Sequence, residues 1–408
     1  MRRTPQRPGR CLQRTTAGRG LVMAMGEEDL LKISILMADS GGGHRTAAVS
    51  LAEALEGVAQ VTFLNLMDEH APFPFNQFSS GYGSVVNFAP WFYTLLYNYA
   101  GSRKRVEFTQ RVLYPWVRPN LAAALKTACP DLVISVHPIQ TDVPLRILRE
   151  LGSSAPFVTV VTDPVSPPVS WFCPHVDLCV VATEPAREMA LACGMDAERV
   201  RVIGLPIRRA FREVRGRPKA IARAQVGMNQ DLPLVLMTGG GAGIGKLLPM
   251  AQAITRRMAA CGLPSQMAII AGRNQVLLQR LRAEPWAVPV TILGYVDAMA
   301  DWMAAADLLV TKAGPGTLAE AACLGLPVAI TGFVPGQEAG NIDWVTRTHT
   351  GVFAEKPEEV GKMVCELLAP GNPELYQMSA RAMALSRCNA AEEIAAAVLA
   401  LNPRPATL

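Results

Sequence analysis

The chain of 408 residues is longer than one hydrophobic core usually organises, and half of its residues are apolar, so we expect two folded domains and exclude a disordered chain. No window reaches the roughly 18 uninterrupted apolar residues that span a bilayer, so we do not expect an integral membrane protein. The net charge of +5 is local: six of the 39 basic residues are arginines at the very start, and the remaining 33 nearly balance the 34 acidic residues.

The arginine-rich leader, residues 1–29, lacks the apolar core of a secretory signal. Two interpretations stay open for it. It is a basic, disordered arm, or it reflects a start site placed upstream of Met23 or Met25. We therefore assign it no function.

The cysteines are scattered, odd in number and never spaced C-x-x-C. They are Cys11, Cys129, Cys173, Cys179, Cys193, Cys261, Cys323, Cys365 and Cys388. This pattern argues against a disulfide framework and against a zinc–thiolate site. It predicts a reducing, cytoplasmic location.

Two copies of a strand, glycine loop and helix pattern open the two halves of the chain, at Lys32 and at Leu232. Further apolar runs follow each opening without alternation, as buried parallel strands require. These runs lie at 61–67, 131–137, 157–163, 177–183, 264–272, 290–296, 307–314 and 325–332. Each half therefore predicts a doubly wound α/β sheet.

Composition also predicts the domain boundaries. Proline, glycine and several arginines interrupt the rhythm at 204–225, so we place an N-terminal domain at 30–210 and a C-terminal domain at 211–372. The alanine-rich segment 373–408 predicts a helix that packs back on the first domain.

The first glycine loop, SGGGHR at 40–45, lets backbone amides approach a ligand at the start of a helix. It is neither a P-loop nor a good dinucleotide fingerprint. His44 stands at the carboxyl end of a strand, where open α/β sheets bind ligands, and a neutral imidazole there can accept a proton from a hydroxyl. The alternative is a helix-capping or packing histidine.

The second glycine loop, residues 239–245, suits a diphosphate, because it again opens a helix and carries more glycine than a turn needs. The alternative is a flexible turn. Lys246 is either a counter-charge for phosphate or a solvated side chain.

The stretch 311–345 carries the densest polar chemistry. Glu320 falls on a helix that follows a strand and a glycine–proline loop, where one carboxylate can accept both hydroxyls of a ribose. Gln337, Glu338 and Asn341 follow the next strand and suit sugar hydroxyls. No Asp-x-Asp occurs in the sequence, so we expect no metal, and helix dipoles and backbone amides would stabilise a leaving diphosphate.

Aromatic and basic residues interleave between Ala71 and Pro119. The aromatic residues are Trp91, Phe92, Tyr93, Tyr97, Tyr99, Phe108, Tyr114 and Trp116, and the basic residues are Arg103, Lys104, Arg105, Arg111 and Arg118. This mixture suits the headgroup layer of an anionic membrane. The alternative is a helical layer with its rings in the core. Nothing else supports nucleic-acid binding, so we expect no nucleic-acid partner.

His137 and Asp163 each close a buried run, at the ends of SVH and VTD. Both are candidates for the cleft. The alternative is that each satisfies a neighbouring backbone amide.

Several of these segments are shared with a known family. From Lys32 to Leu368 the chain resembles the monogalactosyldiacylglycerol synthase and diacylglycerol glucosyltransferase group of glycosyltransferase family 28. The motifs are DSGGGHR, SVHP, VTD, the WF pair at 171–172, GLPIR, AGRN at 271–274, TKAGPGTLAEA and PGQEAGN. The PVSPP stretch at 164–168 departs from the more polar sequence expected there.

The resemblance implies a GT-B fold, in which two Rossmann-like domains face a central cleft. It implies that the first domain binds a lipid acceptor and the second a UDP-sugar. His44 would be the base, and Gly42, Gly43, His137, Asp163 and Trp171 would lie on the acceptor side. The donor would contact Gly240, Gly241, Gly243, Arg273, Gly314, Gly316, Thr317, Glu320, Gln337, Glu338 and Asn341.

The implied reaction is inverting transfer of galactose from UDP-galactose to the free hydroxyl of 1,2-diacylglycerol. UDP-hexose is then a substrate, and we expect no cofactor. The expected partners are diacylglycerol and an anionic membrane surface, with the enzyme peripheral on the cytoplasmic face. A UDP-glucose-dependent enzyme and a non-catalytic UDP-sugar-binding regulator remain alternatives.

Overall fold

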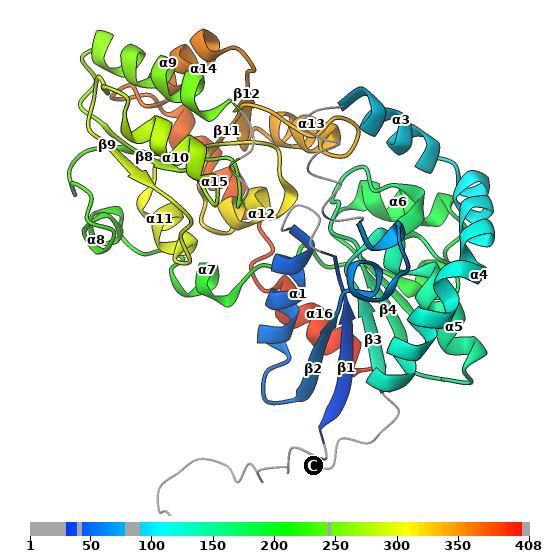
Figure 1. Ribbon diagram of the computed structural model, residues 1–408. Helices are drawn as coiled ribbons and strands as arrows, with labels where there is room; N and C mark the ends of the chain where they lie inside the picture. Colours follow the sequence, from blue (N-terminus) through cyan, green and yellow to red (C-terminus); the bar gives the residue numbers. More distant parts are fainter. Residues whose placement is uncertain (1–29, 39–42, 78–89, 242, 244–245, 402–408) are drawn as a thin grey trace, which may run out of the picture. The chain divides into compact units, whose positions relative to one another are not determined.

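Short runs of branched apolar residues form one parallel sheet in each half of the chain in the computed structural model (Figure 1). The structure describes residues 30–38, 43–77, 90–241, 243 and 246–401. The first sheet has the order β2-β1-β3-β4-β5-β6. Its strands are β1 (Leu31–Leu36), β2 (Ala59–Leu64), β3 (Leu132–Ser135), β4 (Phe157–Val160), β5 (Leu178–Val181) and β6 (Val200–Val202).

The second sheet has the order β12-β11-β10-β7-β8-β9, and all its neighbours are parallel. Its strands are β7 (Leu234–Thr238), β8 (Gln266–Ile270), β9 (Val290–Leu293), β10 (Leu308–Thr311), β11 (Val328–Ile330) and β12 (Gly351–Phe353). Counted from β7, this order is that of a dinucleotide-binding Rossmann sheet. The predicted pair of doubly wound sheets is confirmed.

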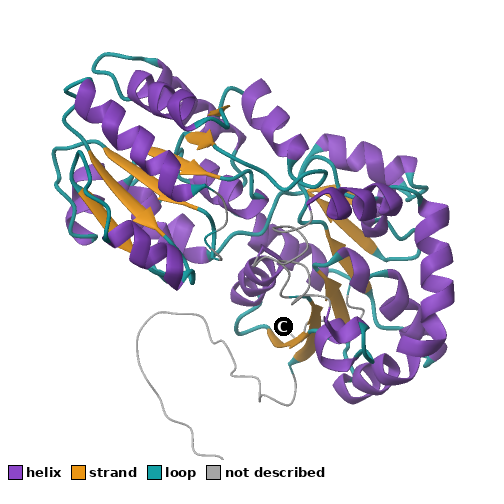
Figure 2. Cartoon of the chain, turned by 45° about the horizontal axis from the view of Figure 1, so that its top comes forward, coloured by secondary structure: helices purple, strands orange, loops and turns teal. Residues whose placement is uncertain are grey.

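Helices cover both faces of each sheet (Figure 2). In the first half they are α1 (Gly43–Ala54), α3 (Pro90–Ala100), α4 (Arg103–Ala128), α5 (Asp142–Glu150) and α6 (Glu184–Ala192). The linker carries α7 (Arg209–Glu213) and α8 (Lys219–Gln225). The remainder are α9 (Leu247–Ala260), α10 (Gln275–Arg282), α11 (Met299–Ala305), α12 (Pro315–Cys323), α13 (Ala339–Arg347), α14 (Pro357–Leu367), α15 (Glu374–Leu385) and α16 (Ala390–Leu399).

Five short helical turns complete the description. They are η2 (Leu66–His70), η3 (Phe75–Gln77), η4 (Pro138–Gln140), η5 (Val169–Trp171) and η6 (Ala197–Arg199). Within the described residues, no helix is both long enough and apolar enough to cross a bilayer.

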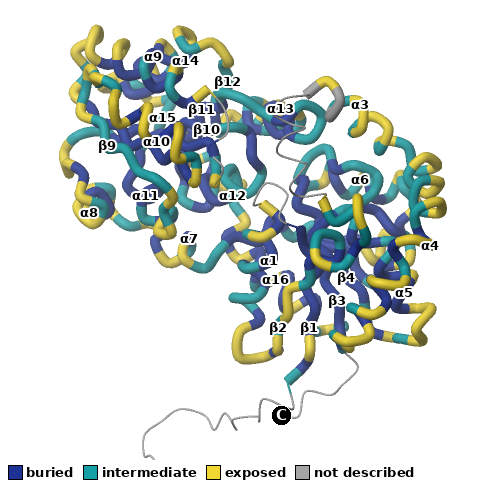
Figure 3. The backbone as a smooth tube through the Cα atoms, in the orientation of Figure 1, coloured by how far each residue is buried: buried dark blue, intermediate teal, exposed yellow. Residues whose placement is uncertain are grey.

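Each sheet lies between two apolar clusters, which is why its strands are apolar on both faces. In β7, Leu234 and Leu236 belong to one cluster, and Val235 and Met237 belong to the other. The central strands of both sheets accordingly lie in the buried interior, whereas the edge strands β2, β6, β9 and β12 are partly exposed (Figure 3).

The predicted C-terminal segment forms α15 and α16. Ile394 and Val398 of α16 join the apolar cluster that contains Ile33 and Ile35 of β1. The chain therefore returns to the first sheet after completing the second (Figure 1). The predicted bounds of the domains, and the assignment of lipid to one and donor to the other, stay predictions.

One cysteine pair departs from the expectation of unpaired cysteines. Cys323 and Cys388 form a disulfide, with their Cα atoms 5.3 Å apart. It ties the end of α12 to the segment before α16. The sequence could not indicate this pair, because 65 residues separate its members and nothing marks them among nine scattered cysteines.

Candidate functional site

The candidate site forms where the strand order of each sheet changes direction. Such switch points leave a crevice at the carboxyl ends of the strands. In the first sheet the switch lies between β1 and β3, which precede His44 and His137. In the second it lies between β7 and β10, which precede Gly240 and Lys312.

His44 is held in one tautomer by a main-chain carbonyl. Its Nδ1 lies 2.8 Å from the carbonyl oxygen of Val136 and 3.1 Å from Oγ1 of Thr162. Because a carbonyl oxygen only accepts, Nδ1 carries the hydrogen, and Nε2 keeps its lone pair. Burial lowers the pKa of His44, while the charge of Asp163 and the carbonyl of Val136 oppose this shift. The imidazole is therefore a neutral base near pH 7.

His137 stands edge-on to His44, with ring centroids 4.5 Å apart. Its Nδ1 accepts from the amide of Ile139 at 3.3 Å, as the cap of a short helical turn. Burial and then the charge of His44 hold the pKa of His137 well below its usual range. His137 thus stays neutral and orients its neighbour.

Asp163 bridges residues from the two halves of the chain. One carboxylate oxygen accepts from Nε1 of Trp171 at 2.7 Å, and the other accepts from Nε2 of Gln337 at 3.0 Å. Trp171 itself is fully buried. Its indole N–H therefore helps to hold Asp163 in place. Because the ring is buried, it presents no exposed surface for the predicted contact with an acceptor.

Glu320 lies in α12, whose first turn begins at Pro315, a residue suited to a helix start. Arg208 Nη2 lies 3.6 Å from its carboxylate. Burial raises the pKa of Glu320 to about 7, against the opposing charge and hydrogen bond of Arg208. A buried carboxylate of this kind can accept hydrogen bonds from the two hydroxyls of a ribose.

Lys312 is a cationic site residue that sequence reasoning missed. It follows β10 directly, and its ammonium pairs with Oε1 of Glu338, while Oε2 of Glu338 accepts from the amide of Val334 at 2.8 Å. Glu338 therefore stabilises the loop that it belongs to and fixes the position of the Lys312 ammonium. A lysine directly after a predicted buried strand was the available signal.

Most of the predicted residues meet in one cavity of about 1150 Å³, counted to its open mouth. The predicted residues that line it are Gly43, His44, Asp163, Gly240, Gly241, Gly314, Gly316, Thr317, Glu320, Gln337 and Glu338. Thr162 and Lys312 line it as well. The cavity thus places a neutral base, a buried carboxylate and a cation together.

The other predicted residues that the structure describes are not among those that line this cavity. Asn341 donates to the carbonyl of Ala313 at 2.9 Å and fixes the loop before α12. Gly243 has φ of +61°, and a Cβ there would meet the carbonyl oxygen of Ala271 at 2.3 Å. The guanidinium of Arg273 lies 4.1 Å from the ring centre of Tyr295. Gly42 lies outside the described residues.

The aromatic and basic segment is largely exposed. Trp91 of α3 is 72% exposed, and Phe108 and Trp116 of α4 are 64% and 67% exposed. Phe108, Val112 and Trp116 are four residues apart, so they form one outer stripe of α4. Of the predicted aromatics, Tyr114 is instead buried, and the side chains of Phe92 and Tyr93 lie outside the description.

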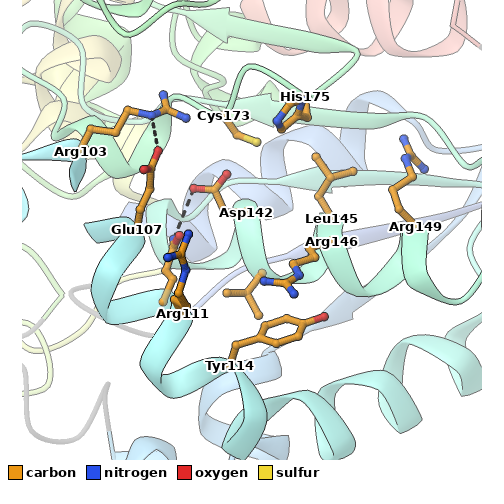
Figure 4. Close-up of a pocket in the computed structure, with 12 residues that line it drawn as sticks. Arg103, Glu107, Arg111, Tyr114, Asp142, Leu145, Arg146, Arg149, Cys173 and His175 are labelled. Carbon is orange, nitrogen blue, oxygen red and sulfur yellow. Dashed lines mark hydrogen bonds and ion pairs between the residues drawn. The ribbon is translucent and has the colours of Figure 1, made fainter. Parts of the chain in front are cut away.

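In a charged pocket between α4 and α5 several polar side chains contact one another or main-chain groups, while Arg111, which also lines it, makes no ion pair with a described residue (Figure 4). Arg103 bonds to Glu107 at 2.8 Å, and Gln110 donates to Asp142 at 3.3 Å. Arg149 binds two main-chain carbonyl groups. We assign no ligand to this pocket.

Among the described residues, no three His, Cys, Asp or Glu side chains gather in a way that could hold a metal ion. The polar groups of the candidate site instead contact main-chain groups, a tryptophan, an amide and two cations.

Comparison with known proteins identifies the family. The family model for monogalactosyldiacylglycerol (MGDG) synthase matches residues 44–207, and the model for the C-terminal domain of glycosyltransferase family 28 matches residues 234–341. The probable MGDG synthase of Glycine max is 37% identical over 375 residues, which cover 89% of this chain and 70% of the relative. The chain belongs to the monogalactosyldiacylglycerol synthase family. It is accordingly a hexosyltransferase.

Two further relatives match over similar lengths. MGDG synthase 1 of Arabidopsis thaliana is 35% identical over 375 residues, with 89% of this chain and 69% of the relative covered. The enzyme of Spinacia oleracea is 36% identical over 385 residues, with 91% and 73% covered. All three relatives are named as chloroplastic proteins. The predicted location on the cytoplasmic face of a membrane is therefore wrong.

Solved structures confirm the GT-B fold of this family member. MurG of Acinetobacter baumannii aligns with a TM-score of 0.58 at 17% identity, over 91% of this chain and 100% of that one. Anabaena HepE in complex with UDP and glucose gives 0.54 at 16% identity, over the same shares. A UDP-N-acetylglucosamine 2-epimerase of Neisseria meningitidis gives 0.56 at 12% identity, over 90% and 99%. At these identities the likeness shows the fold alone, which transferases and epimerases share.

Proposed function

We propose that this enzyme transfers galactose from UDP-galactose to the free hydroxyl of 1,2-diacylglycerol, with inversion at the anomeric carbon. The observation that carries the proposal is that His44, a neutral buried base, shares one cavity with the donor-side groups Lys312 and Glu320. The MGDG synthase relatives support galactose and diacylglycerol as the two substrates. We propose no cofactor beyond the sugar nucleotide.

On the donor side, each part of UDP has a matching group in the cavity. The Glu320 carboxylate would accept hydrogen bonds from the two ribose hydroxyls. The diphosphate would lie against Gly240, Gly241 and the amino end of α12, where main-chain amides favour an anion. Lys312 would add a positive charge as the diphosphate departs.

On the acceptor side, His44 would act as the general base. The glyceride oxygen attacks the anomeric carbon, its proton passes to Nε2 of His44, and the bond from that carbon to the diphosphate breaks to release UDP. Attack opposite the leaving group turns an α-linked donor into a β-glycoside. General-base assistance of this kind contributes about 10²–10⁴-fold.

The outer stripe of α4 supplies a surface for a lipid substrate. Phe108, Val112 and Trp116 are exposed, and the exposed cations Lys104 and Arg105 lie on the same helix. Aromatic rings at an apolar boundary with cations beside them suit an anionic membrane. We therefore propose that this stripe rests on the membrane that holds the diacylglycerol.

The alternative donor is UDP-glucose, which differs from UDP-galactose at one hydroxyl. A non-catalytic UDP-sugar-binding regulator is disfavoured by His44, because a binding module needs no buried base with a lone pair in its cavity.

The test is UDP release and lipid product with dioleoylglycerol micelles, comparing UDP-galactose with UDP-glucose. We expect UDP-galactose to be used, and we expect His44→Ala to bind UDP with turnover lowered by about 10²–10⁴-fold. Equal or faster use of UDP-glucose would replace the proposed donor. Binding of UDP without any transfer by the wild-type protein would favour the regulator.

A further inference from the structure

A second, apolar cavity lies beneath α4, away from the donor cavity. It encloses about 910 Å³ including its open mouth and is lined mainly by Leu, Val, Ile, Phe and Tyr side chains. On α4 the lining residues are Val106, Thr109, Gln110, Leu113, Tyr114, Val117 and Leu121. Their spacing of three and four residues defines the inner face of the helix, distinct from the outer stripe of Phe108, Val112 and Trp116.

Most polar groups around this cavity are turned to other partners, and one exception is the Tyr114 hydroxyl, which is buried and makes no hydrogen bond within the described part of the chain. Gln140 is fully buried, donates to the carbonyl of Met37 and accepts from the amide of Leu66. Thr109 bonds to the carbonyl of Arg105, and Gln110 donates to Asp142 in the neighbouring charged pocket (Figure 4). A cavity with so few polar groups in its lining does not hold water well and favours an apolar ligand.

Segments that line this cavity continue along the chain into residues on the acceptor side of the active site, although the two cavities have no described lining residue in common. Ser170 lines it and immediately precedes Trp171, which bonds to Asp163. Ile139 and Gln140 line it and follow His137, whose ring contacts His44. A ligand in this cavity would therefore lie beside the segments that orient the base.

Resting on the function proposed above, we propose that this cavity holds one acyl chain of the diacylglycerol acceptor. An acyl chain is the apolar part of the proposed substrate, and the lining of this cavity is mainly apolar. An acyl chain that enters the cavity from a bilayer moves from one apolar environment to another. The cavity therefore adds little to the affinity for the lipid, and its main effect is to position the lipid. It fixes the glyceride so that its hydroxyl reaches His44.

The first test is photolabelling, which does not require turnover. A diacylglycerol with a diazirine at the end of one acyl chain is presented to the full-length protein in mixed micelles, and labelled peptides are mapped. We expect label on the cavity side of α4 or on η4, and a loss on the order of tenfold in Leu113→Trp, which fills the cavity. The matched control Ala123→Trp adds the same ring at an exposed position of α4 and should keep the label.

Three labelling results would overturn the inference. Label confined to the outer side chains Trp91 or Trp116 would assign the chain to the surface. Undiminished label in Leu113→Trp would show that the cavity is not its site. If the label is lost when the protein self-associates, although no competing lipid has been added, the cavity would be the binding site for a second copy of the protein.

The second test uses acceptors that dissolve as monomers, dihexanoylglycerol and dioctanoylglycerol. Each methylene moved from water into an apolar site contributes about fourfold, so two more in the cavity should raise kcat/KM by roughly 15-fold. We expect Leu113→Trp, and Val143→Phe on the opposite wall, to abolish this preference while UDP binding is kept. A preference retained in both variants would refute the inference.

The two tests separate this inference from the proposed function. Label in the cavity without sugar transfer would refute the transferase and keep the acyl-chain site. Sugar transfer without label in the cavity would refute the acyl-chain site and keep the transferase.

Discussion

Replacing Glu320 by glutamine should remove a loss of stability that the wild-type protein suffers as the pH rises. The pKa of Glu320 is about 7 in the folded protein, against an ordinary value of 4.5. Between these values the folded state keeps a proton that the unfolded chain has released. This contribution to stability is fully present below pH 4.5 and is lost as the pH rises through 7.

The size of this effect follows from the two pKa values. Their separation corresponds to about 3 kcal/mol of folding free energy, using about 1.4 kcal/mol per pH unit. The side chain is nearly buried, so solvent screens the effect little. Glutamine has the same shape and does not titrate. The Arg208 it leaves behind reaches water and does not lose its charge.

The assay is urea unfolding of both proteins at pH 5 and pH 8, without nucleotide. We expect Glu320→Gln to gain about 3 kcal/mol on the wild-type protein between pH 5 and pH 8. Taking the difference between the two proteins cancels groups that titrate equally in both. An unchanged difference at the two pH values would refute the burial of an under-compensated carboxylate.

Uridine binding extends the same prediction to the ligand. Uridine has the ribose but no phosphate, so its own charge stays constant between pH 6 and pH 8. Because the ribose hydroxyls bind the ionised carboxylate, uridine should bind about tenfold more weakly at pH 6 than at pH 8. Glu320→Gln should bind weakly at both. If the affinity of the wild-type protein for uridine does not change with pH, Glu320 does not bind the ribose.

Four further changes test the site, each by its own measurement. His44→Ala should lower turnover by about 10²–10⁴-fold with UDP affinity kept in calorimetry, and near-normal turnover would remove the base assignment. Asp163→Asn should move the acidic limb of the kcat/KM profile to lower pH, because the charge that raises the pKa of His44 is gone; an unmoved limb contradicts this. Lys312→Ala should weaken UDP on the order of tenfold and leave uridine binding unchanged, whereas equal losses would exclude a diphosphate contact. Replacing Phe108 and Trp116 by serine should reduce sedimentation with anionic vesicles and not UDP binding, and unchanged sedimentation would place the membrane contact elsewhere.

The two sheets could be predicted because their strands are buried on both faces. Runs such as VTVV at 158–161 are continuous in β-branched residues, and a glycine loop with a helix follows the first strand of each half. These are local signals, and parallel sheets require them. The strand order that creates the two switch points depends on contacts between distant segments, and only the structure supplies it.

The site residues were predicted unevenly for a similar reason. His44 and Glu320 stand directly after glycine loops, where the sequence marks a ligand crevice. Lys312 was overlooked because its pairing with Glu338 joins two loops that the sequence does not connect. Arg208 was overlooked because it lies in a stretch of arginines that reads as a basic linker, and its contact with Glu320 spans more than a hundred residues.

The aromatic segment shows what composition leaves open. Interleaved rings and cations between Ala71 and Pro119 fit both a membrane surface and a buried helical layer. The structure divides α4 between the two: Leu113 and Tyr114 face inward, while Phe108 and Trp116 face outward. Which face a residue takes depends on where α4 packs, and this is a tertiary property.

The central claim is the transfer of galactose from UDP-galactose to diacylglycerol with inversion. The most direct measurement is the proton NMR spectrum of the lipid formed from UDP-galactose and dioleoylglycerol by the wild-type protein. We predict a monogalactosyl lipid whose anomeric coupling shows a β-linkage. An α-linked product, or UDP release with no galactolipid, would contradict the proposed reaction.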